Sequence, residues 1–250
     1  MSYVDLTHAG EVAVLTLHRG KVNAFNESFV KELKARLGEL SADVTTRALI
    51  LTGHGKFFSF GFDVPELYPL SKEDFTRFVN HFTELYTTLY LYPKPVIAAL
   101  NGHTIAGGCM LAVACDRRLM AEGSAKISLN EITFGATVFA GSVDKLRACV
   151  GQRNAEEILL SGAMYGPEEA LSLGLVDRVI AGDKLMPAAL EEARVLASRD
   201  GAVFSNMKRL LRGPVVEAMR SRESESIREF VEIWYSESTR EQLKGIEIRK

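Results

Sequence analysis

Alternating and helically spaced apolar residues in the first third of the chain predict strands and helices in turn. Residues 11–18 alternate and are rich in Val and Leu, and residues 47–52 are also strongly apolar, so both segments predict strands. Between them, residues 26–40 have the apolar spacing of a helix, for which Asn26 is a suitable N-cap. From Ser71 a longer helix is predicted to present one apolar face: Phe75, Phe78, Phe82, Leu85 and Leu89.

Glycine and proline residues in the middle of the chain predict where helices end and where the chain turns. Residues 65–70 are predicted to be irregular, and Pro93 and Pro95 end the long helix. Residues 95–100 are small and branched, as in a buried strand. The chain then turns at Asn101-Gly102 and Gly107-Gly108 into a short apolar helix over residues 109–114, and a strand is predicted at residues 117–121.

The chain becomes mostly helical beyond Ser142. Gly151 and Gly162 are predicted to separate consecutive helices, residues 175–180 resemble a strand, and residues 183–199 form an amphipathic helix. The segments on either side of Gly213-Pro214 are mainly polar helices that carry a few large apolar residues: Val216, Met219, Ile227, Phe230, Val231 and Trp234. This order predicts an α/β fold with a strand-helix N-terminal region and a helical C-terminal region.

Composition and charge argue against several classes of protein, among them nucleic-acid-binding and membrane proteins. The formal charge of -2 comes from 30 basic and 32 acidic residues, so the chain has no electrostatic reason to bind nucleic acid or an anionic membrane. Its three cysteines form no CxxC pair, which argues against a disulfide framework or a zinc site. The N-terminus lacks a signal region and no apolar run reaches the length of a membrane span, so a cytoplasmic location is expected.

Two segments are suited to place backbone N–H groups near a ligand. Phe57-Phe-Ser-Phe-Gly-Phe-Asp63 ends a strand at a glycine, and Ile105-Ala-Gly-Gly-Cys109 opens a helix, where free N–H groups and the helix dipole favour negative charge. Together they are candidates for an oxyanion hole. The alternative is that each glycine only permits a tight, closely packed turn.

Glu131 is the candidate base. It lies in the mostly apolar stretch Ile127-Ser-Leu-Asn-Glu-Ile-Thr-Phe134, where loss of solvation would make its carboxylate more basic. A solvated glutamate at the end of a strand is the competing interpretation.

Other polar or reactive residues have simpler structural interpretations. His103 is expected to be structural, Asp63 to cap or turn the chain, and Asp116 to accept from local backbone donors. Cys109 lacks a nearby His or carboxylate partner, so it is expected to be a core residue and not a nucleophile. The phenylalanines after Ser71 are expected to be core, with an acyl pocket as the alternative. The sequence contains no phosphate-binding loop, Rossmann fingerprint or metal-ligand cluster.

Read together, residues 57–63 and Asn101-Gly-His-Thr-Ile-Ala-Gly-Gly-Cys109 resemble the paired signatures of the crotonase, or enoyl-CoA hydratase/isomerase, superfamily. Val22-Asn23-Ala24 resembles the first substrate-side loop of that family. Residues 150–151, 155–162 and 170–176 resemble its post-catalytic helices. The resemblance therefore spans nearly the whole chain.

The resemblance implies a fold and a set of site residues. The fold is a spiral of strand-strand-helix repeats with a C-terminal helical trimerisation region. The oxyanion donors fall on the N–H groups of Phe62 and Gly107, and the catalytic carboxylate on Glu131. The residues implied in binding the substrate and its CoA are Val22, Asn23, Ala24, Phe60, Gly61, Asp63, Val64, Met110 and Asn130.

One departure from the family pattern selects a reaction. Hydratases of this family use two glutamates, and the position of the first is occupied here by Met110 while the second is Glu131. Adding water requires two positioned carboxylates, whereas a 1,3-proton shift needs one base. Together with Leu129-Asn130-Glu131, this resembles the mitochondrial-type 3,2-enoyl-CoA isomerases. The alternatives are a hydratase, another lyase or hydrolase of the same fold, or a non-catalytic acyl-CoA-binding or RNA-binding member, although the near-neutral charge argues against RNA.

The resemblance also predicts how the chain is organised. Residues 1–196 are expected to form the catalytic core, and residues 197–250 a helical oligomerisation region that assembles a homotrimer or hexamer. Phe230, Val231 and Trp234 are expected to be buried in intersubunit or interdomain contacts. The partner is an acyl-CoA thioester whose coenzyme A is part of the substrate, so no separate cofactor or metal is expected.

Overall fold

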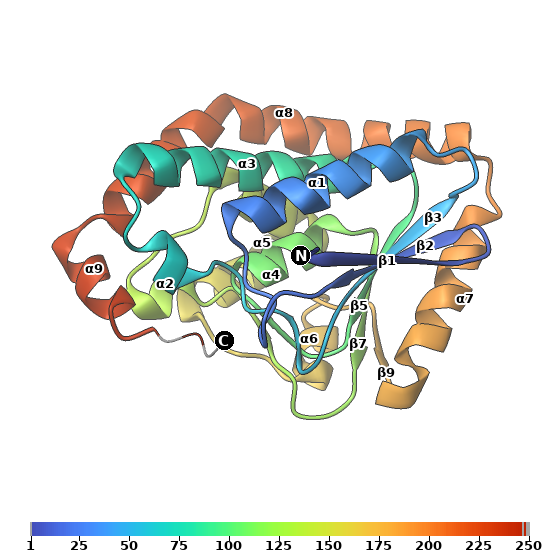
Figure 1. Cartoon of the computed structure of the whole chain (residues 1–250), viewed down its shortest axis with the longest axis horizontal. Coiled ribbons are helices and arrows are strands. Elements are labelled where there is room, and N and C mark those ends of the chain that lie inside the picture. Colours follow the sequence, from blue (N-terminus) through green and yellow to red (C-terminus); the bar gives the residue numbers. More distant parts are fainter. Residues whose placement is uncertain (1, 247, 249–250) are drawn as a thin grey trace.

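The computed structural model describes residues 2–246 and 248, which form two β-sheets and the helices that cover them (Figure 1). The larger sheet has the strand order β1-β2-β3-β5-β7-β9, and the smaller has the order β4-β6-β8. β1 runs antiparallel to β2, and the other strand pairs of both sheets are parallel. The strands are β1 Val4–Ala9, β2 Val12–Leu17, β3 Ala48–Gly53, β4 Phe57–Ser59, β5 Val96–Leu100, β6 His103–Ile105, β7 Arg117–Ala121, β8 Ile127–Ser128 and β9 Arg178–Ile180.

Helices follow the strands in a repeating order. The helices are α1 Glu27–Ala42, α2 Val64–Leu67, α3 Lys72–Tyr90, α4 Gly107–Ala114, α5 Ala140–Ser161, α6 Pro167–Ser172, α7 Leu185–Ala197, α8 Gly201–Trp234 and α9 Glu237–Leu243, with 3-10 helices η1 Glu131–Phe134 and η2 Gly182–Lys184. Three times, a strand of the large sheet leads to a strand of the small sheet and then to helix: β3-β4-α2-α3, β5-β6-α4 and β7-β8-η1-α5. This confirms the predicted strand-strand-helix plan.

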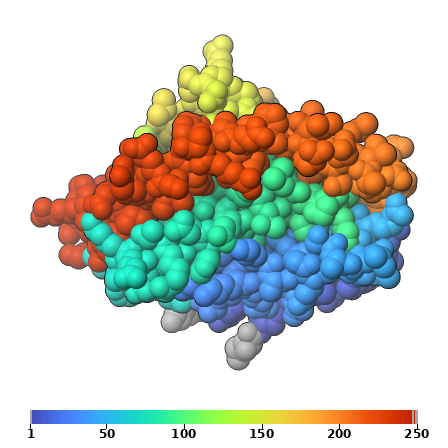
Figure 2. All heavy atoms as spheres, turned by 90° about the horizontal axis from the view of Figure 1, so that it is seen from above, coloured from blue at the N-terminus to red at the C-terminus, as the bar shows by residue number. Residues whose placement is uncertain are grey.

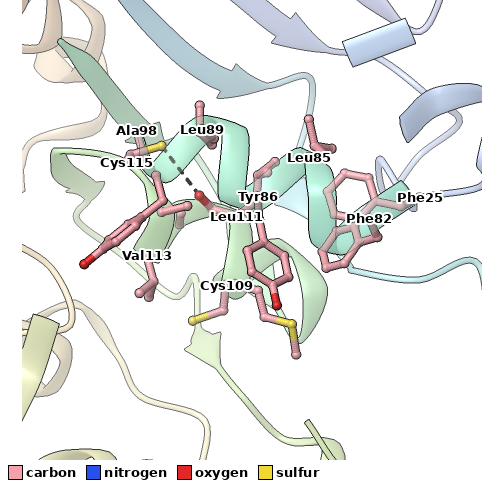
Figure 3. Packing of buried hydrophobic residues seen from close by; sticks show 14 of the residues in the cluster. Phe25, Phe82, Leu85, Tyr86, Leu89, Ala98, Cys109, Leu111, Val113 and Cys115 are labelled. Atoms are coloured by element: carbon pink, nitrogen blue, oxygen red, sulfur yellow. Dashed lines mark hydrogen bonds between the residues drawn. The ribbon is translucent and has the colours of Figure 1, made fainter. Parts of the chain in front are cut away.

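Apolar side chains fill both faces of the large sheet. On one face α7 packs its small residues Ala189 and Ala193 against the buried strand residues Ile50 and Ile97. On the other face α4 is wholly buried, and its Leu111 and Val113 belong to the same apolar cluster as Leu85, Tyr86 and Leu89 of α3 (Figure 3). Beyond it, α1, α3 and α8 lie side by side as an outer layer (Figure 2).

Several predicted elements differ in detail. Residues 65–70 were expected to be irregular, but α2 forms there because Asp63 accepts a hydrogen bond from the Glu66 N–H and Pro65 fits the first turn. The strand predicted over residues 175–180 is shorter, since Leu175 and Val176 are buried in a turn before β9. The predicted break at Gly213-Pro214 is absent, and α8 continues through Pro214, which is exposed.

The second half of α8 packs on its own chain. Phe230, Val231 and Trp234 are almost completely buried without any partner subunit, and Phe75 of α3 stacks on Trp234 with ring centroids 4.4 Å apart. These residues therefore give no argument for a trimer, because the contact that buries them is internal. The division at residue 197 stays a prediction. It falls at the end of α7, one short turn before α8 begins.

Asp116 anchors the first half of α8 to the sheet. Its Oδ2 accepts from the Val96 N–H at 2.7 Å. Asp116 therefore satisfies a backbone donor, as predicted, but the donor lies on β5 and is not local in the sequence. The same carboxylate also binds the buried Lys208 ammonium at 2.8 Å and the Arg212 guanidinium at 3.0 Å. Within the described residues, no helix combines the length and apolar character needed to cross a membrane.

Replacing Asp116 with Ala is expected to lower the free energy of unfolding by about 3 to 5 kcal/mol, because the Lys208 ammonium would remain buried without its carboxylate. Urea unfolding followed by circular dichroism measures this change. Glu225→Ala is the control, since it removes only the exposed partner of Arg228 and should change stability by less than about 1 kcal/mol. An equally small effect of Asp116→Ala would contradict the anchoring role.

Candidate active site

The three strands of the small sheet end at the same edge and deliver three functional segments there. β4 leads to Gly61 and Phe62, β6 leads to Ala106 and Gly107, and β8 leads to Glu131. Because β4, β6 and β8 are parallel neighbours, the residues that follow their carboxyl ends converge. The topology thus brings together the two predicted oxyanion donors and the predicted base.

Close packing joins the two donor segments. Gly61 has a φ of +93°, and a Cβ atom at this position would lie 2.9 Å from the Gly107 nitrogen and 3.0 Å from the Ile105 carbonyl oxygen. Only glycine fits both the conformation and the space. The Phe62 and Gly107 N–H groups have no hydrogen-bond acceptor among the described residues. Both are therefore free to donate to a ligand.

The backbone conformation of Ala106 sets the direction in which α4 begins. It has a φ of +49° and a ψ of -119°, a conformation that costs a non-glycine residue about 1 to 3 kcal/mol. Two backbone hydrogen bonds hold it there: its N–H donates to Ser128 at 2.8 Å, and its carbonyl accepts from Met110 at 3.0 Å. The strain lies directly before Gly107, where it sets the direction of the next N–H.

Glu131 is buried at the first position of η1. Its side chain is 6% exposed, and its Oε2 has no hydrogen-bond partner among the described residues. Loss of solvation by burial raises the pKa of Glu131 to about 8. The solvated glutamate that was the competing interpretation is therefore wrong, and the carboxyl group has the environment of a strong base.

Glu131 faces an apolar cavity of about 250 Å³. Within the described residues, Glu131 is the one ionisable side chain among those that line it. The predicted site residues in the lining are Phe60, Phe62, Val64, Gly107, Met110, Asn130 and Glu131. The lining residues that were not among the predicted site residues are Ile105, Ala106, Phe134, Ala136, Phe139, Phe230, Trp234 and Ile246.

Met110 occupies the wall of this cavity from α4. It is buried, and its sulfur accepts a hydrogen bond from the Ser142 hydroxyl at 3.1 Å. A thioether has no proton to exchange and accepts hydrogen bonds only weakly. This wall therefore offers bulk and no acid–base chemistry.

The other predicted binding residues do not line the cavity. Asn23 is fully buried, and its amide donates to the carbonyls of His54 at 3.0 Å and Phe57 at 2.8 Å. Its side chain therefore braces the loop that contains Val22 and Ala24 and is not free to contact substrate. Gly61 acts through its backbone geometry, as described above.

Asp63 is likewise a bracing residue, as its predicted cap role indicated. Besides capping α2, its carboxylate accepts from the Arg19 guanidinium at 2.6 Å. The same Arg19 nitrogen donates to the Ala24 carbonyl at 2.8 Å. Arg19 thus ties the loop that holds Asn23 to the residue beside Phe62. Arg19 was not among the predicted site residues, because an arginine in a loop carries no local signal of its partner.

The remaining candidates are structural. His103 accepts from the Lys126 N–H at 3.2 Å through its Nδ1, and Cys109 is fully buried, which raises the pKa of its thiol well above the usual range. The phenylalanines of α3 form core, as expected. Among the described residues, no cluster of three His, Cys, Asp or Glu side chains could hold a metal ion.

The arrangement supports one kind of chemistry. A carboxyl group of raised pKa can remove a proton from an adjacent carbon acid, and two free N–H groups can hold the oxyanion that forms. The apolar lining keeps water from competing for either interaction.

Comparisons with known proteins identify the family of the chain. The family model for enoyl-CoA hydratase/isomerase matches residues 7–250. A short-chain-enoyl-CoA hydratase of Clostridium acetobutylicum is 34% identical over 200 residues, covering 79% of this chain and 76% of the relative. The mitochondrial enoyl-CoA delta isomerase 1 of Rattus norvegicus is 35% identical over 176 residues, covering 70% of this chain and 61% of the relative.

A solved structure extends the likeness to the whole fold. The crystal structure of human mitochondrial delta3-delta2-enoyl-CoA isomerase has a TM-score of 0.94 and 27% identity, and the match covers 97% of this chain and 96% of that chain. The family match and the shared fold both extend over nearly the entire chain. We conclude that the chain belongs to the enoyl-CoA hydratase/isomerase family of the crotonase superfamily.

Proposed function

We propose that this enzyme is a 3,2-enoyl-CoA isomerase of fatty acid β-oxidation. One observation supports this reaction above the others of the family: Glu131 is the sole ionisable side chain among the described lining of the cavity. Met110 also lines it, at the position where the resemblance to the family implies the other glutamate of a hydratase. Moving a double bond needs one base, whereas adding water needs a second group to orient the water.

The reaction begins with the thioester carbonyl oxygen of a 3-enoyl-CoA between the N–H groups of Phe62 and Gly107. The Glu131 carboxylate removes a proton from C2, and the electron pair of that C–H bond moves into a dienolate whose oxygen the two N–H groups stabilise. Glu131 then returns its proton to C4. The double bond now joins C2 and C3, and atoms and charge balance without a water molecule, metal or redox cofactor.

The apolar surroundings of Glu131 favour return of the abstracted proton to the substrate over its loss to solvent. Glu131 keeps the abstracted proton because burial raises its pKa to about 8, so the protonated carboxyl group is the favoured state near neutral pH. Met110 contributes volume on the side where a hydratase would hold water. The likeness to the human isomerase also supports the proposal, while the hydratase names among the relatives keep hydration as the alternative. A hydrolase or a non-catalytic acyl-CoA-binding protein of the same fold is a more distant alternative.

The coenzyme A moiety is proposed to lie along Val22–Ala24 and Phe60–Val64. The second segment lines the cavity, and its Phe60 N–H donates to the Val22 carbonyl of the first at 2.9 Å. A homotrimer or hexamer in the cytoplasm also remains part of the proposal. The assembly is supported by an apolar stripe on the first half of α8. The residues of this stripe are exposed in the described chain: Val203, Met207, Leu210 and Leu211.

Glu131→Gln is expected to lower the turnover of 3-hexenoyl-CoA by about a hundredfold to ten-thousandfold, because it removes the base and keeps the side-chain shape. Steady-state kinetics measure turnover, and calorimetry with hexanoyl-CoA should show retained binding. Glu122→Gln makes the same chemical change at an exposed position and should leave turnover unchanged. Near wild-type isomerisation by Glu131→Gln would reject the assigned mechanism.

The pH profile provides a second test of the buried base. Only the carboxylate can take a proton, so kcat/KM of the wild type should rise about tenfold per pH unit until it levels near the pKa of Glu131, about 8. Initial rates between pH 5.5 and pH 9 would be measured in buffers of constant ionic strength, roughly spanning that transition. A profile already flat at pH 6 would show that Glu131 ionises like an ordinary carboxyl group.

A further inference from the structure

Aromatic rings from distant parts of the chain close one side of the cavity. Phe139 lies at the start of α5, and Phe230 and Trp234 come from the last turns of α8. The rings of Phe139 and Phe230 have centroids 4.4 Å apart, and those of Phe230 and Trp234 are 6.1 Å apart. We refer to these three residues as the aromatic wall.

The aromatic wall lies next to the ring of Phe62, at the oxyanion site, and leads away from it. The ring of Phe62 lies against Gly107, where a Cβ atom would meet two of its carbons at 3.3 Å. Phe62 is 6.5 Å from both Phe139 and Phe230, measured between ring centroids, and Trp234 lies beyond Phe230. A thioester held at Gly107 would therefore direct its acyl chain past Phe230 toward Trp234.

The wall is held firmly in place by polar contacts of α8. The Glu223 carboxylate accepts from the Gly141 N–H and from the Tyr86 hydroxyl, each at 2.8 Å, which ties α8 to the start of α5 and to α3. On the other side of the wall, the Tyr235 hydroxyl donates to the Leu70 carbonyl. Behind it, Phe75 stacks on Trp234. The polar contacts thus fix α8 on both sides of the aromatic wall, and the stacking on Phe75 supports the Trp234 ring from behind.

The size of the cavity sets a limit on what fits. An apolar cavity of about 150 Å³ holds benzene, with six carbon atoms, so by proportion this cavity of about 250 Å³ holds roughly ten. The carbonyl carbon and C2 to C4 must occupy the part beside Glu131. The remaining space is enough for a short tail that ends at the aromatic wall.

We propose that Phe230 and Trp234 are specificity-determining residues that restrict the site to acyl groups of up to roughly ten carbons. The inference rests on the proposed function in that it takes an acyl-CoA as the ligand, and it adds which class of acyl-CoA the site accepts. Trp234 is the better residue to vary. Its indole N–H has no acceptor among the described residues, so removing the ring changes volume without leaving a known partner unpaired.

Binding of saturated acyl-CoAs tests the limit without depending on the reaction. Calorimetry on the wild type with hexanoyl-, octanoyl-, tetradecanoyl- and hexadecanoyl-CoA should show affinity rising to octanoyl-CoA and then falling by about tenfold or more for tetradecanoyl-CoA. Trp234→Leu should recover most of that loss for tetradecanoyl-CoA and leave hexanoyl-CoA binding within about twofold. Phe230→Leu provides a second opening of the same wall if Trp234→Leu does not fold.

Phe29→Leu is the matched control, because it removes a fully buried ring that does not line the cavity. Its length profile should equal that of the wild type. Wild-type affinity that keeps rising through tetradecanoyl-CoA, or a folded Trp234→Leu with an unchanged profile, would overturn the inference. A length limit in binding without isomerisation of any 3-enoyl-CoA would instead reject the proposed function, and efficient isomerisation of 3-tetradecenoyl-CoA would reject only the limit.

Discussion

The rest of the site depends on the burial of the Glu131 carboxyl group, whose Oε2 has no hydrogen-bond partner among the described residues. Burial makes this group a stronger base, but it also makes its charged form costly to the folded protein. The folded state prefers the protonated carboxyl, so Glu131 lowers stability increasingly as pH rises from its unfolded pKa toward about 8. Other parts of the structure must offset this cost. The buried apolar core of α3, α4 and the large sheet contributes the stabilising free energy.

The small sheet makes such a site possible with few polar groups. Its parallel strands end together, so Phe62, Gly107 and Glu131 meet at one edge of the sheet. In the proposed reaction, Glu131 is the one side chain that carries the proton. The same proposal assigns the charge that develops on the substrate to backbone N–H groups, which need no buried counter-ion. The bracing contacts of Arg19 and Asn23 lie outside the cavity, where their polarity does not solvate Glu131. The polar side chains that hold the loops are thus separate from the apolar cavity in which the proposed reaction takes place.

Local sequence patterns predicted the parts of the fold and site that depend on neighbouring residues. Asn26 caps α1, and the glycines before Phe62 and at Gly107 lie in the turns that their flanking patterns indicated. The short helix α2 was missed because its one turn depends on a cap and a proline and not on apolar periodicity. Phe230 and Trp234 were recognised as buried, but their place in the wall depends on α8 folding back over the core, a contact between segments far apart in the sequence. No pattern within α8 encodes that contact.

The most direct measurement compares two substrates on the wild-type enzyme. Purified protein would be incubated with 3-hexenoyl-CoA and, separately, with 2-hexenoyl-CoA, and the products separated by chromatography and identified by mass. One buried carboxylate beside Met110 predicts efficient conversion of the first substrate to 2-hexenoyl-CoA and very little 3-hydroxyhexanoyl-CoA from the second. Formation of the hydroxyacyl product at a rate equal to or above isomerisation would contradict the claim that a single glutamate limits this enzyme to proton transfer.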